Sequence, residues 1–370
     1  MKVMTILGTR PEIIRLSCVM ARLEATEVID HVLVHTGQNY DYELNQVFFD
    51  DLDVRTPDHF LACNSSSLGH TYGDILIKTE EVLLEERPDA VLILGDTNSA
   101  IAAVIARRMH IPVFHMEAGN RSFDWRVPEE TNRRIVDHIS DVNLAYTEHA
   151  RNNLLREGIH PQRIYVTGSP MFEVLEHYRP QIVASDVVGR LGLEPQSYVV
   201  ASLHREENVD DATRLGLLLD GLVAFCEPRD LDIVLSTHPR TLKRLDEFGL
   251  LHSYEGKIRF ADPFGFHDYN KLQMNSACAL SDSGTISEEA SILGFAAATP
   301  RDWIERPEAL DAGSVVMTGV DRQAIVRGMA FAIQAGPNVG VPEDYQVANC
   351  SDRVVRLLVG RDRALRSTQR

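Results

Sequence analysis

Short apolar runs rich in β-branched residues alternate with longer helical patterns along the whole 370-residue chain. In the first part of the chain the candidate strands lie at residues 3–7, 29–35, 90–94, 113–115, 142–145 and 163–166. Helical patterns separate them, among others at residues 11–24, 68–86 and 98–109. Strands that alternate with helices form βαβ units, in which helices cover both faces of a parallel sheet. The alternation therefore predicts an α/β fold.

A second series of strand patterns begins after the turn residues Gly168-Ser169-Pro170. Its candidate strands lie at residues 198–202, 232–236, 258–260, 277–280, 296–298 and 315–317. A chain of this length is also too long for one ordinary domain. We therefore predict two consecutive Rossmann-like domains, residues 1–170 and 171–345. The last segment, residues 346–370, carries a helical pattern that either stays with the second domain or returns to the first.

Composition and charge limit the classes of function. The formal net charge of −17 disfavours a polyanionic partner such as a nucleic acid, although a few local arginines are enough to bind a small phosphate ligand. No apolar run approaches the roughly 18 residues that cross a membrane, and the first residues lack the layout of a signal peptide. We therefore expect a cytoplasmic protein without a membrane partner. Five scattered cysteines without a CxxC pair fit reduced core thiols better than disulfides or a metal site.

The turn after the first candidate strand has features of an anion site. In an open parallel sheet, ligands bind beyond the carboxyl ends of the strands. Gly8 permits a tight turn there and Pro11 suits the first turn of a helix, so Arg10 would lie at a helix N-terminus. Any strand-to-helix turn can contain Gly and Pro, however, so this pattern alone leaves phosphate binding open.

Acidic residues follow two further strands that we expect to be neighbours. Asp96 follows the strand at 90–94 and Glu117 follows the strand at 113–115, while Glu129 begins the next helical pattern. Each acid alone is explained equally well as a helix cap or as a first-turn acid. Three acids after strand ends favour a shared site, because capping does not require them to cluster.

Histidines directly follow two strands of the second half, at His204 and His238. A histidine at such a position either faces a ligand or belongs to the core, and both interpretations stay open. Ser283 and Gly284 follow another strand and open a helix, which suits a diphosphate. Glu289 lies within reach of ribose hydroxyls on the same helix. The chain has neither GxGxxG nor GxxxxGK[ST], which disfavours NAD and P-loop nucleotides.

Seven short motifs stand in order along the chain: GTRPE at 8–12, GDTNS at 95–99, HMEAGNR at 115–121, PEETNR at 128–133, HREEN at 204–208, SDSGTISEEA at 281–290 and ERPEA at 305–309. In this order they resemble the bacterial non-hydrolysing UDP-N-acetylglucosamine 2-epimerases over nearly the whole chain. The resemblance implies the GT-B fold, in which two Rossmann-like domains have a cleft between them and the second domain binds most of the UDP. It also implies a homodimer, no metal and no other cofactor.

The resemblance further implies a reaction and roles for the matching residues. The hydrogen on carbon 2 of the sugar is not acidic, so the family eliminates UDP to a 2-acetamidoglycal and adds it back with the proton on the other face. Asp96, Glu117 and Glu129 match the acid/base residues, and His204 assists at the glycosidic oxygen or phosphate. The residues expected to bind the substrate or departing UDP are Arg10, Arg15, His204, Arg205, His238, Ser283, Gly284, Glu289 and Arg306. Tyr269 either packs near the base or belongs to the core.

Some positions depart from the members that act on UDP-N-acetylglucosamine. Arg15 stands where those carry a lysine, and the segments 38–42 and 120–127 differ, the first of which belongs to a region that binds an allosteric substrate molecule in some members. These variants resemble the branch that makes UDP-N-acetyl-L-fucosamine from its 2-epimer, the 6-deoxy-L-talose sugar, for surface polysaccharides such as capsule or O-antigen. The substrate is therefore either this sugar or UDP-N-acetylglucosamine and its manno epimer.

Other functions share the same fold. A GT-B glycosyltransferase has no need of three carboxylates around carbon 2, and a binding protein would tolerate their loss. A hydrolysing 2-epimerase would release free N-acetylmannosamine, so product analysis distinguishes it.

Overall fold

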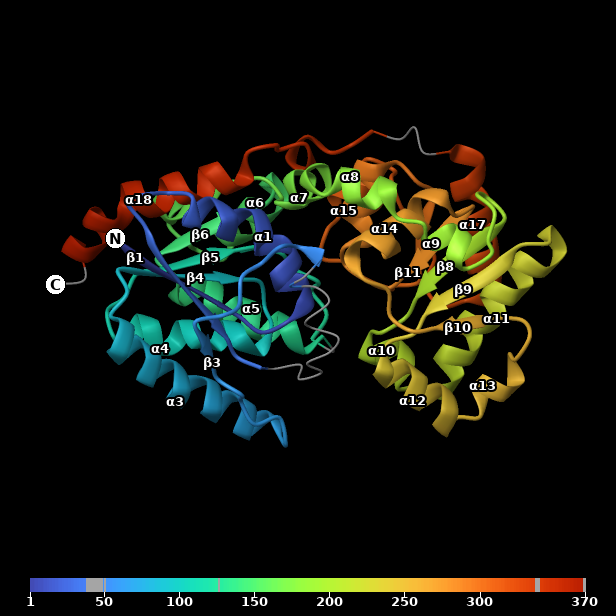
Figure 1. The fold of residues 1–370 in the computed structure, drawn as a ribbon, viewed down its shortest axis with the longest axis horizontal. Coiled ribbons are helices and arrows are strands. Elements are labelled where there is room, and N and C mark those ends of the chain that lie inside the picture. The colour runs from blue at the N-terminus through green and yellow to red at the C-terminus, as the bar shows by residue number, and fades with distance from the viewer. Residues whose placement is uncertain (38–48, 50, 126, 337–339, 369–370) are drawn as a thin grey trace. The chain divides into compact units, whose positions relative to one another are not determined.

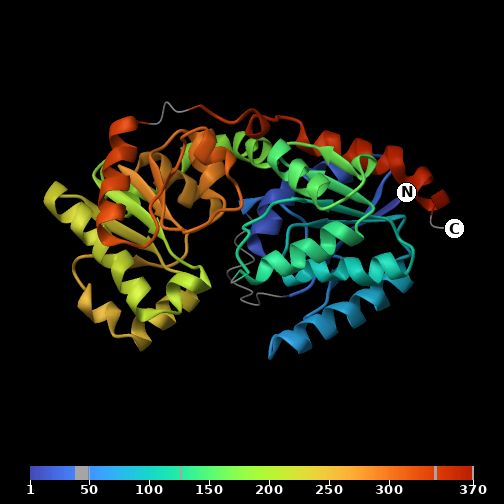
Figure 2. The ribbon, with the colours of Figure 1, turned by 180° about the vertical axis from the view of Figure 1, so that it is seen from behind.

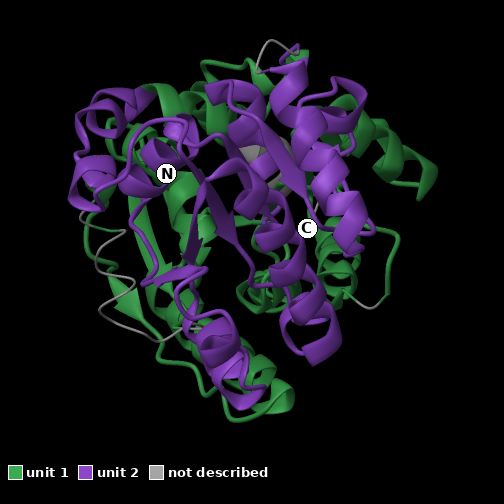
Figure 3. Cartoon of the chain, turned by 90° about the vertical axis from the view of Figure 1, so that its right-hand side faces the viewer, with its two compact units in different colours: residues 1–176, 343–370 green, residues 177–342 purple. Residues whose placement is uncertain are grey.

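The computed structural model describes residues 1–37, 49, 51–125, 127–336 and 340–368. The segment 38–42, which the sequence relates to allosteric control, lies outside them. The chain divides into two compact units, coloured separately in Figure 3: unit 1 comprises residues 1–176 and 343–370, and unit 2 comprises residues 177–342. None of the described helices is both long enough and apolar enough to span a membrane.

Unit 1 is built on a parallel sheet whose described strands have the order β3-β2-β1-β4-β5-β6-β7. The strands are β1 (Lys2–Leu7), β2 (Asp30–His35), β3 (His59–Phe60), β4 (Ala90–Leu94), β5 (Val113–Met116), β6 (Val142–Ala145) and β7 (Ile164–Val166). Nearly continuous apolar strands such as β4 are buried on both faces, as expected for a parallel sheet. The order of the strands reverses between β1 and β4, because the chain first builds outward from β1 to β3 and then returns.

Helices cover both faces of this sheet (Figure 1). The helices of unit 1 are α1 (Arg10–Glu24), α3 (Leu68–Glu86), α4 (Ala102–Arg108), α5 (Pro128–Ile139), α6 (Glu148–Arg156), α7 (Met171–His177) and α18 (Cys350–Thr368). Alternate strand residues such as Met4, Ile6 and Ile93 pack with α3, α4 and α5 in one apolar cluster. The opposite face is covered by α1 and α18, which pack on each other.

The C-terminal helix α18 belongs to unit 1 and lies along it in both Figures 1 and 2. The Cys350 thiol donates to the Gly168 carbonyl oxygen at 3.3 Å, and the backbone N–H of Ser351 donates to Glu173 at 2.8 Å. Contacts with Gly168, after β7, and with Glu173 of α7 therefore hold the start of the helix. In the structure this helix therefore packs with the first unit.

Unit 2 repeats the design with the described strand order β10-β9-β8-β11-β12-β13, again all parallel. Its strands are β8 (Tyr198–Ser202), β9 (Asp232–Ser236), β10 (Arg259–Ala261), β11 (Cys278–Ser281), β12 (Ala297–Thr299) and β13 (Val316–Met317). Its helices are α8 (Arg179–Ala184), α9 (Val187–Arg190), α10 (Glu206–Val209), α11 (Ala212–Cys226), α12 (Pro239–Glu247), α13 (Leu250–Ser253), α14 (Phe266–Asn275), α15 (Ile286–Leu293), α16 (Glu308–Asp311) and α17 (Arg322–Ala335).

The core of unit 2 follows the same alternation. Val199 and Ala201 pack with α11 and α17 on one face of the sheet. Tyr198 points to the other face, where its hydroxyl donates to the Leu272 carbonyl oxygen of α14 at 2.7 Å. The strand order of this unit reverses between β8 and β11. Because ligands bind where the order of an open parallel sheet reverses, the loops after β1, β4, β8 and β11 are the expected ligand-binding positions.

Candidate active site

A buried carboxylate, Glu12, joins the two loops at the reversal point of unit 1. Its Oε2 accepts hydrogen bonds from the Gly8 backbone N–H at 2.9 Å and the Thr9 hydroxyl at 2.8 Å, and its Oε1 accepts from the Thr97 hydroxyl at 3.0 Å. Burial raises the pKa of Glu12 to about 7, although these hydrogen bonds lower it. Arg10 begins α1 beside this contact and is partly exposed. The sequence did not predict Glu12 as a site residue, because an acid in the first turn of a helix is common.

Glu117 lies directly after β5 in the left-handed region, with φ of 62°, which is unfavourable for a residue with a Cβ atom. Its side chain is buried; Oε2 lies 3.9 Å from Nε of Arg15, and Oε1 accepts from Nδ2 of Asn120 at 3.2 Å. A Cβ on Gly95 would lie 3.7 Å from Oε2, so the carboxylate adjoins the loop after β4. The structure thus places Arg15 as a buried partner of Glu117, with its guanidinium 5.7 Å from the centre of the Tyr146 ring.

Asp96, in the loop after β4, is held by helix α5. Its carboxylate pairs with Arg133, and its carbonyl oxygen accepts from Nδ2 of Asn132 at 3.0 Å. Both the side chain and the backbone of Asp96 are therefore fixed by α5. The loop that carries Asp96 also adjoins Glu117, so the structure brings together the ends of β4 and β5 as expected.

Two neighbouring acids at the start of α5 have different surroundings. Glu130 is fully buried, and its carboxylate lies 3.3 Å from Arg133 and 2.8 Å from Arg134. Glu129 is partly exposed. The pKa of Tyr72 on α3 is raised first by the burial of Tyr72 and also by the negative charge of Glu129. Glu130 is thus a partner in buried ion pairs, and Glu129 is the acid of this pair that remains a candidate for the reaction.

A buried network of charges fixes the turns after β4 and β5. The ring nitrogens of His115 lie 2.9 Å from Asp137 and 2.7 Å from the Gly95 carbonyl oxygen. The second oxygen of Asp137 lies 2.7 Å from Arg121, which also donates to Glu157 at 2.9 and 2.6 Å. Burial alone would raise the pKa of Asp137, but His115 and Arg121 outweigh it and hold the pKa below its ordinary value. Since an unpaired buried charge is costly, the members of this network depend on one another.

In unit 2 a carboxylate again joins the loops at the reversal point. Oδ1 of Asp282, which follows β11, lies 3.0 Å from Nδ1 of His204, which follows β8. The same carboxylate accepts from the Arg205 backbone N–H at 3.1 Å. The next residue, Ser283, has its hydroxyl 3.0 Å from that of Thr285. His204 thus lies beside the predicted diphosphate loop, and its side chain is 39% exposed.

The guanidinium groups of Arg306 and Arg205 lie next to the backbone of the loop at Gly284. A Cβ on Gly284 would lie 2.4 Å from Nη1 of Arg306 and 3.7 Å from Nη2 of Arg205. Carboxylates orient both groups: Arg306 Nε lies 3.3 Å from Glu288, and Arg205 Nη2 lies 3.5 Å from Glu305. Two arginines above a glycine-containing loop form a cradle that fits a diphosphate.

The other predicted binding residues of unit 2 are placed by local contacts. His238 caps α12, where its Nδ1 accepts from the Arg240 backbone N–H at 3.3 Å, so the neutral ring carries its proton on Nε2. Glu289 is buried in α15 and accepts from Nε2 of Gln273 at 3.0 Å. Burial, with the charge of Glu289 next, raises the pKa of Tyr269.

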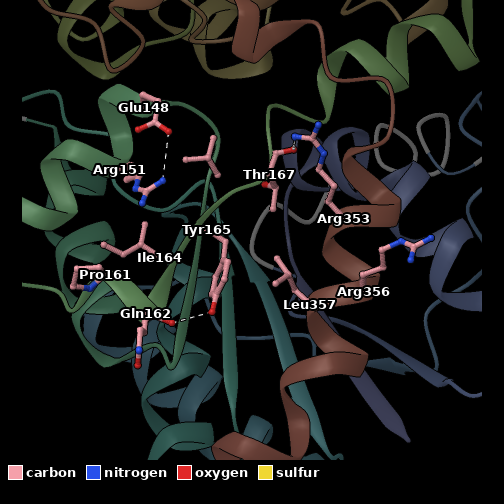
Figure 4. A pocket seen from close by; sticks show the side chains of 11 residues that line it. Glu148, Arg151, Pro161, Gln162, Ile164, Tyr165, Thr167, Arg353, Arg356 and Leu357 are labelled. Atoms are coloured by element: carbon pink, nitrogen blue, oxygen red, sulfur yellow. Dashed lines mark hydrogen bonds and ion pairs between the residues drawn. The ribbon is translucent and has the colours of Figure 1, made fainter.

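Unit 1 also has a groove between β7, α6 and α18 (Figure 4). Its three arginines each contact an acceptor: Arg151 lies 3.5 Å from Glu148, Arg353 donates to the Thr167 carbonyl oxygen at 3.3 Å, and Arg356 lies 2.5 Å from Asp352. Of the described residues that line the groove, none belongs to the predicted site. We therefore assign it no ligand.

Two doubly wound units, each with charged loops where its strand order reverses, define a protein of the GT-B class. Residues 21–359 match the family model of UDP-N-acetylglucosamine 2-epimerase, so the chain belongs to this family. The chain is similar to the solved UDP-N-acetylglucosamine 2-epimerase of Rickettsia bellii, with 45% identity, a TM-score of 0.92 and coverage of 99% of this chain and 98% of that one.

Two further relatives show the range of the family. The Methanocaldococcus jannaschii enzyme, solved in complex with UDP-GlcNAc and UDP, is 37% identical with a TM-score of 0.92 and coverage of 97% of this chain and 100% of that one. The UDP-2,3-diacetamido-2,3-dideoxy-D-glucuronate 2-epimerase of Pseudomonas aeruginosa is 34% identical over 88% of this chain and 90% of its own. The names of these relatives therefore include more than one sugar.

Proposed function

We propose that this chain is a non-hydrolysing UDP-N-acetylhexosamine 2-epimerase that inverts carbon 2 by eliminating UDP and adding it back. The observation that carries the proposal is a set of three acids in unit 1: Asp96 in the loop after β4, Glu117 directly after β5 and Glu129 in the first turn of α5. The arginine cradle over Gly284 in unit 2 supports UDP as the leaving group. Membership of the family supports the same reaction class.

The chemistry explains why several acids are needed. In the forward step a base removes the proton from carbon 2, the C1–O bond breaks, and its electron pair leaves on the UDP oxygen as the C1=C2 double bond forms. In the return step that oxygen attacks C1, and an acid delivers a proton to the opposite face of C2. Each face of C2 thus needs a group that acts as base in one direction and as acid in the other. The cradle holds the released UDP until it adds back.

The test is a reaction in deuterated water, followed by NMR of the product. We expect deuterium at C2 and migration of oxygen-18 from the C1–O bridge into other phosphate oxygens. Retention of the original hydrogen at C2 would overturn the elimination mechanism. Release of free N-acetylmannosamine would indicate a hydrolysing 2-epimerase, and transfer of the sugar to an acceptor would indicate a glycosyltransferase.

For the substrate, we propose UDP-2-acetamido-2,6-dideoxy-L-talose, which the enzyme converts into UDP-N-acetyl-L-fucosamine. Arg15 stands where relatives that act on UDP-N-acetylglucosamine carry lysine, and it contacts the acid Glu117. The variant segment 120–127 presents Phe123 and Trp125, which are 66% and 69% exposed and offer apolar surface of the kind that suits a C6 methyl group.

A site shaped around a methyl group has no partner for a C6 hydroxyl, and burying that hydroxyl unpaired costs about 1–3 kcal/mol. This corresponds to roughly tenfold to a hundredfold in kcat/KM. The comparison of kcat/KM for both UDP-sugars, without added effector, tests the assignment. A higher value for UDP-N-acetylglucosamine would reject this sugar and leave the epimerase reaction intact.

We also propose that the enzyme works as a cytoplasmic homodimer that supplies a surface-polysaccharide pathway, as the family resemblance implies. Light scattering that gives twice the chain mass supports the dimer, and a monomeric mass at working concentration contradicts it.

A further inference from the structure

The carboxylate of Asp282 in unit 2 accepts several hydrogen bonds from the segment after β8. Asp282 is fully buried, and its two oxygens accept from the His204 backbone N–H at 3.0 and 3.2 Å. Oδ2 also accepts from the Arg205 backbone N–H and from Nδ2 of Asn208, both at 3.1 Å. The fourth group around it is the imidazole of His204, whose Nδ1 lies 3.0 Å from Oδ1.

These contacts decide which nitrogen of His204 carries a proton. Burial alone would raise the pKa of Asp282, but the charge and hydrogen bonds of His204 and its neighbours lower it to about 2. An ionised carboxylate only accepts hydrogen bonds, so each group around it must donate. Nδ1 of His204 is therefore the protonated nitrogen. A proton can then enter or leave the ring only at Nε2, on the side away from Asp282.

We propose that Asp282 is a positioning residue that fixes the tautomer and orientation of His204, so that Nε2 exchanges its proton with the oxygen joining the sugar to UDP. This inference rests on the proposed function. Asp282 is well placed for it because it directly precedes the Ser283–Gly284 loop of the diphosphate cradle. One residue thereby couples the histidine after β8 to the phosphate loop after β11.

The balance of the step is simple. When the C1–O bond breaks, the UDP oxygen takes the electron pair, and the doubly protonated ring of His204 donates its Nε2 proton to that oxygen, which leaves the ring neutral with its proton on Nδ1. When UDP adds back, that proton returns to Nε2. Asp282 keeps its charge throughout and stabilises the protonated ring, so it needs no proton of its own.

The direct test is 15N NMR of wild-type enzyme labelled at histidine, with His204→Asn to assign the signal. We expect the His204 signals of a ring that is protonated at Nδ1, both without ligand and with UDP. A neutral ring that carries its proton on Nε2 instead would overturn the proposal. This measurement does not use turnover, so its outcome is distinct from a failure of the C2 exchange experiment.

Substitution gives a second test. In Asp282→Asn the amide can donate to Nδ1, which moves the His204 proton to Nε2, and we expect kcat to fall by about a hundredfold with little change in KM. Asn208→Ala is the matched variant, since it removes another donor to the same carboxylate without touching the imidazole. It should keep the wild-type tautomer.

A double-mutant cycle separates positioning from structural damage. If Asp282 acts through His204, then adding Asp282→Asn to His204→Asn should lower kcat by less than threefold beyond His204→Asn alone. A full hundredfold further loss in the double variant would show that Asp282 acts by another route and would refute the proposal.

Discussion

Replacing Gly119 with alanine should destabilise unit 1 far more than the same change at Gly158. Both glycines have φ of +85°, which L-residues rarely adopt. They differ in their surroundings: a Cβ on Gly119 would lie 2.3 Å from the Ala150 carbonyl oxygen and 2.8 Å from Cγ of Leu154, whereas a Cβ on Gly158 would meet nothing within 4 Å. Gly158→Ala is therefore a matched control that measures the cost of the left-handed backbone without a steric contact.

The magnitude follows from two contributions. The left-handed backbone costs an alanine about 1–2 kcal/mol at either position. At Gly119 helix α6 must also move away from the new methyl group, and overpacking of this kind costs about 1–3 kcal/mol more. For a unit of this size each kcal/mol lowers Tm by about 2–4 °C. We therefore expect a fall of about 4–20 °C for Gly119→Ala and of about 2–8 °C for Gly158→Ala.

Differential scanning calorimetry measures the fall in Tm, and kcat provides a second readout. Gly119 lies two residues after Glu117 in the same turn. The backbone movement that accommodates the new methyl group should therefore also displace Glu117, so we expect kcat to fall in Gly119→Ala and not in Gly158→Ala. Equal falls in Tm for the two variants would refute the reasoning, because the contact with Ala150 would then contribute nothing.

Three substitutions remove the charges of the candidate acids: Asp96→Asn, Glu117→Gln and Glu129→Gln. We expect each to lower kcat by about a hundredfold or more with little effect on the Kd for UDP in calorimetry, and near-normal turnover in all three would make these acids structural. Gly284→Ala should displace the Arg306 guanidinium and weaken UDP binding with little change in Tm, so an unchanged Kd would argue against the cradle. Burial raises the pKa of Glu12 from an ordinary 4.5 to about 7. Between these two pH values the Glu12 carboxyl group is protonated in the folded chain and ionised in the unfolded chain. The free energy of unfolding should therefore fall by about 3 kcal/mol relative to Glu12→Gln as the pH rises from 4.5 to 7, and chemical denaturation at several pH values should detect this loss.

Local sequence patterns were enough to predict the class of fold. The apolar runs of β1, β4 and β8 are short and nearly continuous, as in strands that are buried on both faces, and the helical patterns between them have a period of 3.6 residues; short stretches of chain determine both. These patterns indicated two α/β domains, and family membership supports the GT-B class. They also placed Asp96 and Glu117 directly after strands, at the end of a parallel sheet where ligands bind. β3 was missed because two residues carry too little pattern.

Only the tertiary structure decided which side chains meet. Glu129 and Glu130 are adjacent and chemically alike, and the sequence could not show that Glu130 is the one buried between two arginines. Asp282 and His204 are 78 residues apart in the chain, yet they share a hydrogen bond because β8 and β11 are neighbours in the sheet. The physical reason is that strand order and register arise from packing between distant segments, whereas the sequence pattern reports only which face of an element is apolar. The sequence by itself determined the elements and the strand ends that carry charge, and the folded sheet decided which of those charges lie next to one another.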